Sequence, residues 1–387
     1  MNRKLLSPST RSAVEPFLAM EVMRAANDRE AAGGRVIHME VGQPGAPAPT
    51  PVLEAARRAL ADGRFGYTEA LGWRSLRARI ARHYQDAYGL AVPQERIAIT
   101  TGSSAGFILA FLAAFDVGDR IALATPGYPA YRNILAALGL EAVDIETGPE
   151  SRHVLTPAML EKAHAEKRLS GVLVASPANP SGTMMSPAAL AALIGAAEQR
   201  GIAFISDEIY HGLVYAGTAA TALATTDAAI VINSFSKYYC MTGWRIGWMV
   251  LPETLVRPVE RLAQNFYISP PDISQRAAIA AFDARAELEA VKAGYAANRR
   301  LLLDRLPAIG FDDHLPVDGA FYVYASVRRF SNDSVDFARR MLAETGVAAT
   351  PGPDFDRARG HATMRFSFAG TETDMAEAMD RLAAWLG

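Results

Sequence analysis

Polar residues follow several short apolar runs of this 387-residue chain, each within a few positions of the end of a run. They supply amine, carboxylate, amide, hydroxyl and backbone groups: Gly102, Ser103, Ser104, Tyr128, Asn179, Asp207, Tyr210, Ser234, Ser236 and Lys237. Because ligands of open parallel sheets bind at the carboxyl ends of the strands, these residues could meet in one pocket. Together they could perform acid–base or covalent chemistry.

Each of these residues also has a purely structural interpretation. Asp207 could cap the helix that follows it, and Asn179 in SPANPSG could be a turn residue. Tyr128 could be a packed loop aromatic, and a lone lysine after a strand is usually a solvated charge. Only the combination favours a functional site.

The elements expected to position these residues alternate along the chain. Apolar runs predict strands at 97–100, 121–125, 172–176, 203–206, 230–233 and 246–251, and helical patterns occur at 74–88, 107–115, 129–138 and 187–199. In the helix at 74–88 we expect Leu76, Ile80, Tyr84 and Ala87 to point inward. Continuous apolar runs are typical of strands buried on both faces. The sequence therefore predicts an α/β fold whose large domain has a mostly parallel sheet flanked by helices.

The two ends of the chain have a different pattern. A helical face ends at Gly33 and is followed by an extended piece at 36–41. After residue 290, helices are expected over 291–306 and 334–345, strands in DGAFYVYASV and MRFSFA, and a last helix opened by Thr371. This mixture predicts a smaller α+β domain. We expect the large domain at 49–290, and the small domain with an N-terminal segment at 1–48 and 291–387.

Composition excludes several classes of function. The 39 basic and 41 acidic residues give a net charge of −2, which favours neither nucleic acid nor an anionic membrane as a partner. Cys240 is the only cysteine, so no intrachain disulfide and no structural zinc site is expected, and no metal is predicted. The N-terminal segment lacks the apolar core of a signal peptide, and the apolar stretch at 107–115 falls far short of the ~20 residues that span a bilayer. We therefore expect a cytoplasmic protein.

Two motifs and their spacing support a family resemblance. Asp207-Glu208-Ile209-Tyr210 precedes Ser234-Phe235-Ser236-Lys237, and Arg245 in GWRIG follows the lysine by eight residues. From about Gly42 to Arg365 the chain resembles the pyridoxal-phosphate-dependent aminotransferases of fold type I, class I/II, in the aspartate aminotransferase-like superfamily. The resemblance implies an enzyme with pyridoxal 5′-phosphate that moves an α-amino group from an amino acid to a 2-oxo acid by a ping-pong mechanism.

The resemblance implies catalytic roles for Lys237, Asp207 and Tyr210. Lys237 matches the lysine that holds the cofactor as a Schiff base and then moves the proton from Cα to C4′. This work needs a lysine pKa below its reference value of about 10.4, which nearby Arg245 and partial burial would provide. Asp207 matches the carboxylate that pairs with the pyridine nitrogen. Tyr210 and Asn179 match groups that hydrogen-bond the ring hydroxyl oxygen.

Further residues match the parts of the family site that hold the cofactor ring and phosphate. Tyr128 matches the aromatic residue that stacks on the ring. The loop TTGSSAG, with Gly102, Ser103 and Ser104, would open a helix near Ala105 and offer backbone N–H groups to the phosphate. We expect Ser234, Ser236 and Arg245 to complete this cup. Tyr67 matches a tyrosine that reaches the phosphate of the partner subunit, which implies a homodimer with shared active sites.

The resemblance also implies where the substrate binds. Arg365 in MRFSFA matches the arginine that binds the α-carboxylate, for which a bidentate guanidinium is well suited. Gly42 in EVGQP matches a loop that closes over the same carboxylate, and Asn179 and Tyr128 are expected to contact the substrate. Related enzymes specific for aspartate often carry a lysine in the phosphate loop, where this chain has Ser104. The amino donor is therefore left open.

One question of specificity and two alternative functions remain at this point. Tyr238, Tyr239 and Cys240 depart from the usual residues after the lysine and could alter specificity. The same residues also serve other fold-type-I enzymes, such as C–S β-lyases. A serine hydrolase is the remote alternative, because Gly102–Gly106 fits G-x-S-x-G, with Ser104 as nucleophile and Asp207 and His361 in the required order.

Overall fold

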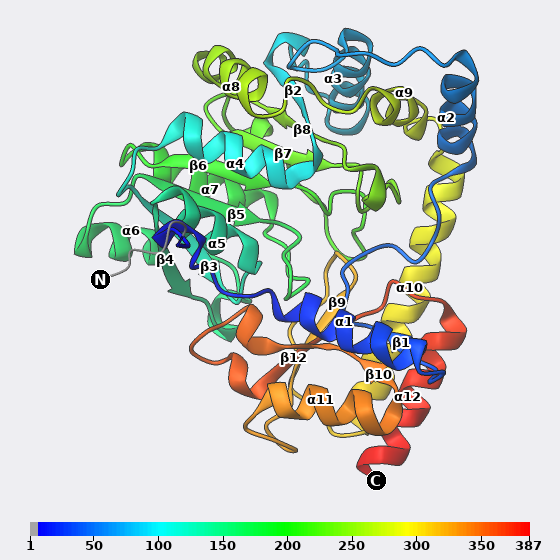
Figure 1. Cartoon of the computed structure of the whole chain (residues 1–387). Helices are drawn as coiled ribbons and strands as arrows, with labels where there is room; N and C mark the ends of the chain where they lie inside the picture. The colour runs from blue at the N-terminus through cyan, green and yellow to red at the C-terminus, as the bar shows by residue number, and fades with distance from the viewer. Residues whose placement is uncertain (1–6) are drawn as a thin grey trace.

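The computed structural model describes residues 7–387 and is organised around one large sheet (Figure 1). Its seven strands lie in the order β2 (Ile97–Thr100), β8 (Gly247–Val250), β7 (Ile230–Ser234), β6 (Ala203–Asp207), β5 (Gly171–Ala175), β3 (Arg120–Thr125) and β4 (Glu141–Glu146). Strand β8 is antiparallel to both of its neighbours, and the other pairs are parallel. The predicted α/β fold with a mostly parallel sheet is confirmed.

Helices cover both faces of this sheet (Figure 1). The helices of this part of the chain are α2 (Thr50–Asp62), α3 (Arg74–Tyr88), α4 (Gly102–Ala114), α5 (Pro129–Leu138), α6 (Pro157–Glu166), α7 (Pro187–Glu198), α8 (Glu253–Phe266) and α9 (Asp272–Ala281). Of these, α2 packs mainly against α9. Alternate residues of one strand belong to different cores: Val172 and Val174 pack in one hydrophobic cluster and Leu173 in another. Burial on both faces explains why the strands are continuously apolar in sequence.

The remaining strands form two small sheets built from both ends of the chain. Strand β1 (Ile37–His38) pairs in parallel with β10 (Val347–Ala348), and β12 (Thr363–Ser367) lies between β11 (Thr350–Pro351) and β9 (Tyr322–Ser326) in an antiparallel sheet. The helices here are α1 (Leu18–Ala31), α10 (Arg285–Ala308), α11 (Ser334–Thr345) and α12 (Glu372–Leu386). The long helix α10 runs from the upper to the lower part of the molecule in Figure 1. Its Leu288 packs in a core of the large sheet and its Tyr295 in the core around β9.

Short 3-10 helices complete the described chain: η1 (Thr10–Ser12), η2 (Gln94–Arg96), η3 (Pro149–Ser151), η4 (Ala222–Ala224), η5 (Thr242–Trp244), η6 (Gly352–Asp354) and η7 (Gly360–Ala362). Residues 1–6, part of the segment judged for a signal peptide, lie outside the described residues. Within residues 7–387, no helix combines the length and apolarity that crossing a bilayer requires.

Several predicted boundaries need correction. Helix α4 begins at Gly102 and not near Ala105, α10 begins at Arg285 and not at residue 291, and β1 is only two residues long. The inward placement of Ala87 is wrong, because its side chain is exposed in the last turn of α3. Helices α2, α6, α8 and α9 and strand β4 were not predicted. The domain boundaries at 49 and 290 stay a prediction.

Candidate active site

The predicted site residues gather where β6 and β7 of the large sheet end and β12 of the small sheet passes. Asp207 is the last residue of β6, Ser234 is the last of β7, and Lys237 follows three positions later. Arg365 lies in the middle of β12. The carboxyl ends of parallel strands are the expected place for a ligand in such a fold.

Lys237 is partly buried, and its amine reaches the backbone of a distant loop. Nζ donates a hydrogen bond to the carbonyl oxygen of Gly42 at 2.5 Å and lies 6.0 Å from the centroid of the Tyr210 ring. Burial lowers the pKa of Lys237 to about 8, with further lowering from Arg365 and Arg245 and an opposing effect of Asp207. The amine is therefore much closer to neutrality at physiological pH than an ordinary lysine.

Asp207 is a buried carboxylate held by neutral donors. It accepts hydrogen bonds from the hydroxyl of Tyr131 and from the backbone N–H of Ile209, the latter at 3.0 Å. Burial raises its pKa to about 6, and these two hydrogen bonds oppose the rise. A nearby protonated nitrogen would stabilise the charged form of such a carboxylate.

Gly102 and Arg245 meet at the start of α4. Gly102 has φ +73°, and a Cβ atom at this position would lie 2.4 Å from Arg245 Nη2, so the absence of a side chain permits the approach. Ser103 is buried and Ser104 is exposed. The first N–H groups of a helix lack partners within it, so this turn offers donors and a partial positive charge beside the guanidinium.

Two hydroxyl groups lie at the end of β7. Ser234 Oγ donates to Ser236 Oγ at 2.9 Å, and the backbone N–H of Ser236 donates to Ser234 Oγ at 3.0 Å. Arg245 donates to the carbonyl oxygen of Thr242 at 3.0 Å and makes no salt bridge within residues 7–387. This cluster of donors and a free cation is suited to an anion such as phosphate.

Arg365 is a cation with only 2% of its surface exposed. Its guanidinium donates to Asn179 Oδ1 at 2.9 Å, to Thr350 Oγ1 at 3.2 Å and to the carbonyl oxygen of Glu40. Its Nε has no hydrogen-bond partner, and no carboxylate of the described chain lies within salt-bridge distance. A buried cation without an anion is costly, so a guanidinium in this environment is suited to an external carboxylate.

The aromatic residues of the site form a connected group. Tyr210 and Tyr322 share a hydrogen bond between their hydroxyl oxygens at 2.7 Å. Tyr128 packs edge-on against Tyr131, with ring centroids 5.2 Å apart, and against Phe17 at 5.9 Å. Tyr128 therefore stands beside the Tyr131–Asp207 pair, where a planar ring could lie against it.

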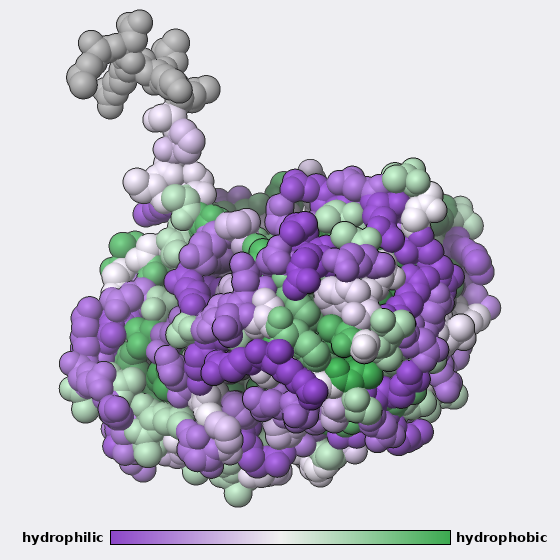
Figure 2. All heavy atoms as spheres, turned by 90° about the horizontal axis from the view of Figure 1, so that it is seen from below, coloured by the Kyte–Doolittle hydropathy of each residue, from purple (hydrophilic) through white to green (hydrophobic). Residues whose placement is uncertain are grey.

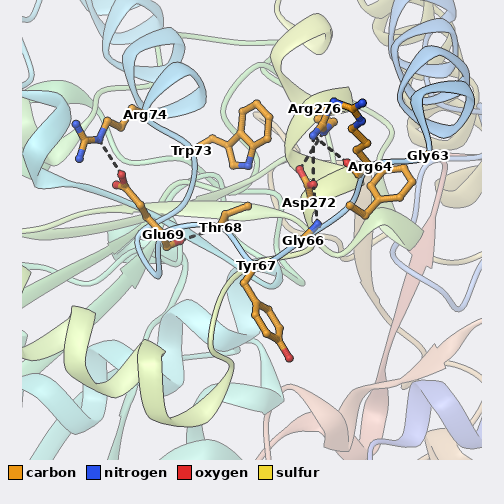
Figure 3. Close-up of a pocket in the computed structure, with 11 residues that line it drawn as sticks. Gly63, Arg64, Gly66, Tyr67, Thr68, Glu69, Trp73, Arg74, Asp272 and Arg276 are labelled. Carbon is orange, nitrogen blue, oxygen red and sulfur yellow. Dashed lines mark hydrogen bonds and ion pairs between the residues drawn. The ribbon is translucent and has the colours of Figure 1, made fainter.

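Tyr67 is the one predicted site residue that lies apart from the others. Its side chain is 82% exposed. Figure 3 shows it pointing away from Trp73 and from the Arg276–Asp272 ion pair, which line the same surface pocket. Among the described residues, no hydrogen bond or ion pair joins Tyr67 to the site of its own chain.

The residues after Lys237 do not point into the site. The Tyr238 hydroxyl donates to Glu289 at 2.6 Å, and Tyr239 packs against Phe235 in the core of the large sheet. Cys240 is buried with φ +55°. The side chains of Tyr238 and Tyr239 therefore pack against other parts of the protein and do not fill the site.

Sequence reasoning missed three residues that hold site groups in place: Tyr131, Tyr322 and Glu40. Tyr131 binds Asp207, Tyr322 binds Tyr210, and the Glu40 carbonyl binds Arg365. The only signal in sequence was the alternation in DGAFYVYASV, which separates Tyr322 from the apolar face of its strand.

The comparisons with known proteins decide the family. A sequence model described as "Aminotransferase class I and II" matches residues 35–382. The chain belongs to this family. The aminotransferase is 51% identical over 97% of both chains to the valine–pyruvate aminotransferase of Mycobacterium tuberculosis. It is 32% identical, again over 97% of both chains, to the aspartate/prephenate aminotransferase of Thermus thermophilus.

Solved structures agree with this assignment. The aminotransferase superposes on a crystal structure of an aminotransferase from Mycobacterium tuberculosis with TM-score 0.96 and 50% identity, covering 98% of this chain and 99% of the other. It also superposes on aspartate aminotransferase from Thermus thermophilus with maleate, with TM-score 0.92 and 31% identity over 98% and 100% of the two chains. The predicted family and enzyme class are confirmed.

The serine hydrolase alternative is wrong. No hydrogen bond within residues 7–387 joins Ser104, Asp207 and His361. Ser104 and His361 are exposed, whereas Asp207 is buried and bound to Tyr131. The family whose model matches the chain is that of the class I and II aminotransferases, not a hydrolase family.

Proposed function

We propose that this aminotransferase works with pyridoxal 5′-phosphate held by Lys237, Asp207, Tyr210 and the residues around α4. The observation that carries the proposal is the environment of Lys237. A lysine with a pKa of about 8 lies with a buried carboxylate, Asp207, and a buried cation that lacks an anion, Arg365. A pyridine aldehyde needs an amine to bond and a carboxylate for its ring nitrogen, and an amino acid needs a cation for its carboxylate. Lys237, Asp207 and Arg365 supply these three groups.

The chemistry of the donor groups fits this cofactor. The contact between Gly102 and Arg245, with the first turn of α4 and the hydroxyl groups of Ser234 and Ser236, forms a place for a phosphate. Asp207 would pair with the pyridine nitrogen, and the positive charge there would relieve the penalty that burial imposes on the carboxylate. When bound, the cofactor supplies an electron sink for the negative charge that develops at the substrate Cα.

Lys237 is the group that would move the proton. As a neutral amine it can accept the proton from Cα, and a pKa of about 8 leaves it able to release that proton again. Arg365 would hold the substrate carboxylate, with Asn179 fixing the plane of its guanidinium. Tyr210 would hydrogen-bond the ring oxygen, and Tyr128 would lie against the ring face.

We also propose a homodimer in which Tyr67 completes the site of the partner subunit. Support comes from large exposed apolar residues on the loop of Phe65 and Tyr67 and, beside it, at the end of α8 and in the loop after it, Phe266 and Ile268. The loops are joined by a hydrogen bond from the N–H of Thr68 to Ser269 Oγ at 3.2 Å. Exposed apolar residues gathered in one place favour contact with another chain.

For the substrate, we propose an amino donor with a small apolar side chain and pyruvate as acceptor. The relative named valine–pyruvate aminotransferase shares 51% of its residues with this chain. The cations of the site, Lys237, Arg245 and Arg365, all have other roles in the proposal, so none is left for a side-chain carboxylate. A panel of amino donors against pyruvate and 2-oxoglutarate tests this, and faster reaction of aspartate than of valine or alanine contradicts it.

We further propose a cytoplasmic location, for which the single cysteine is suited, and a division into domains at residues 49 and 290. Strand pairing between β1 and β10 supports grouping the N-terminal segment with the C-terminal part.

The decisive experiment is covalent fixation. Purified protein should show a visible absorbance band that borohydride converts to a stable adduct on Lys237, and Lys237→Ala should lose the adduct. An adduct on another lysine contradicts the assignment. Mixing with one amino acid, without any acceptor, should convert the band to that of the amine form of the cofactor. Release of ammonia without this conversion would indicate a β-lyase.

A further inference from the structure

Tyr322 contacts several groups to which the proposed function assigns roles. It lies on β9, beside the strand β12 that carries Arg365. It is 1% exposed, and its ring and its hydroxyl group face different partners. Sequence motifs did not single it out as a site residue.

The ring of Tyr322 supports Arg365. The guanidinium carbon of Arg365 lies 4.4 Å from the centroid of this ring. The arginine has no carboxylate partner in the described chain, so its charge is stabilised by its hydrogen bonds and by two ring faces, those of Tyr322 and of Phe355, whose centroid lies 4.8 Å away. The contact with Tyr322 helps to fix the plane in which the guanidinium would meet a substrate carboxylate.

The hydroxyl of Tyr322 reaches the other side of the site. It lies 2.7 Å from the hydroxyl oxygen of Tyr210. A Cβ atom on Gly42 would lie 1.9 Å from the Tyr322 oxygen, so only glycine at position 42 leaves room for this hydroxyl. The carbonyl of the same glycine accepts the hydrogen bond of Lys237.

The Tyr322–Tyr210 hydrogen bond lies close to the charge of Arg365. Burial raises the pKa of both phenols, and the Arg365 guanidinium opposes that rise at both. Either hydroxyl group can donate this hydrogen bond. When Tyr322 is the donor, the proton of Tyr210 is left to donate to another acceptor in the site.

We propose that Tyr322 is a positioning residue that links the carboxylate-binding Arg365 to the phenol of Tyr210. The inference rests on the proposed function and deepens it. The ring orients the arginine, and the hydroxyl orients Tyr210. A substrate carboxylate that moves Arg365 therefore also acts on the group that hydrogen-bonds the cofactor ring oxygen.

Two substitutions separate these two actions. Tyr322→Phe keeps the ring and removes the hydroxyl group. The pH midpoint of the visible band should therefore move by about half a unit or more, and kcat should fall about fivefold. The affinity for pyruvate should stay within twofold of the wild-type value. Tyr322→Leu also removes the ring, so the dissociation constant of pyruvate should rise about tenfold. That constant is measured on the cofactor-free chain by ligand-observed NMR, independently of catalysis.

Tyr324→Phe is the matched control. Tyr324 lies on the same strand and is also buried, but its hydroxyl accepts a hydrogen bond from Thr363 at 2.6 Å, outside the site. It should lose similar stability to Tyr322→Phe without changing the band midpoint or the affinity for pyruvate. Circular dichroism and the unfolding midpoint show whether each variant is folded.

Each outcome decides the inference. If the wild-type protein shows the visible band, but Tyr322→Phe leaves its midpoint unchanged or changes it no more than Tyr324→Phe does, Tyr322 acts only through packing. Unchanged pyruvate affinity in a folded Tyr322→Leu variant removes the link to Arg365. A wild-type protein that forms no adduct with borohydride would instead overturn the proposed function itself, and the inference with it.

Discussion

Tyr131 donates a hydrogen bond from its phenol to the carboxylate of Asp207, across 76 positions of sequence. The second donor to that carboxylate is the neutral backbone N–H of Ile209. A buried negative charge that is held by neutral groups is less stable than one paired with a cation. The cofactor-free chain therefore keeps an electrostatic penalty at the residue proposed to bind the cofactor ring.

This penalty predicts an unusual effect of Asp207→Asn on stability. The pKa of Asp207 is raised from 3.8 to about 6 on folding, so the native chain binds more protons than the unfolded chain between these values. Stability contributed by this group is present below about pH 4 and is lost as the pH rises through about 6. At about pH 8 the variant should stabilise the cofactor-free chain by about 3 kcal/mol.

Urea unfolding of the cofactor-free chain at about pH 5 and about pH 8 measures this effect. The exposed Asp28 on α1 provides the control, because Asp28→Asn should change stability little at either pH. A loss of stability in Asp207→Asn at about pH 8 would contradict the prediction. The same variant should lower kcat at least about a hundredfold, because the ring nitrogen loses its charged partner.

The pKa of Lys237 predicts the pH dependence of cofactor uptake. Only the neutral amine can attack an aldehyde, so the rate at which the visible band appears should rise with pH and level off above about 8. Asp207 raises the pKa of Lys237, so Asp207→Asn should move the midpoint to lower pH. Stopped-flow mixing of cofactor-free chain with pyridoxal phosphate measures the rate. A midpoint near the ordinary value of 10.5 argues against the buried, cation-flanked amine.

Gly102→Ala should weaken binding of the cofactor. The new Cβ would lie 2.4 Å from Arg245 Nη2 and would force the guanidinium away from the first turn of α4. Gly89→Ala is the matched control, because Gly89 also has positive φ but has nothing within 4 Å of the added atom. Both should lose about 1–2 kcal/mol of stability from backbone strain. Only Gly102→Ala should raise the dissociation constant of pyridoxal phosphate, by about tenfold or more.

Arg365→Lys should impair substrate binding while leaving cofactor binding intact. A lysine keeps the charge but loses the planar fork and the donors that bind Asn179 and Thr350. KM for the amino donor should rise about a hundredfold, with the visible band unchanged. Arg340→Lys on α11, where the side chain pairs with Asp336, should leave KM unchanged. Equal effects of the two substitutions would refute the role of Arg365.

Mixing two inactive variants tests whether Tyr67 acts across subunits. A dimer of one Lys237→Ala chain and one Tyr67→Ala chain would contain one intact site if Tyr67 serves the partner. Random reassortment of equal amounts should then restore about a quarter of wild-type activity. If Tyr67 serves its own chain, mixing restores nothing. Co-purification of two differently tagged wild-type chains, mixed in the same way, measures the exchange of subunits.

Local signals in sequence predicted some elements to the residue. Helix α5 begins at Pro129 and ends before Gly139, and α11 ends before Gly346, so proline and glycine mark their ends. Strand β4 was missed because it carries Glu141, Asp144 and Glu146, as an edge strand can. Its place beside β3 supplies the pairing that its own composition does not indicate.

The site was predictable where a residue's position follows from the end of a strand. Asp207 and Lys237 come from this rule and from the spacing of motifs. Tyr131 and Tyr322 could not be found in this way, because their roles depend on which distant side chain they meet. A tyrosine in a helix or strand usually indicates a core, and both residues are indeed buried.

The pairing of β2 with β8 has a consequence for synthesis of the chain. Ile97 of β2 pairs with Val250 of β8, and every other strand of the large sheet lies between them in sequence. During translation, β2 therefore leaves the ribosome long before its partner exists, with its backbone N–H and C=O groups unpaired. Until β8 is made, the nascent chain exposes an apolar strand to other chains, and this is the stage at which a chaperone would be needed most.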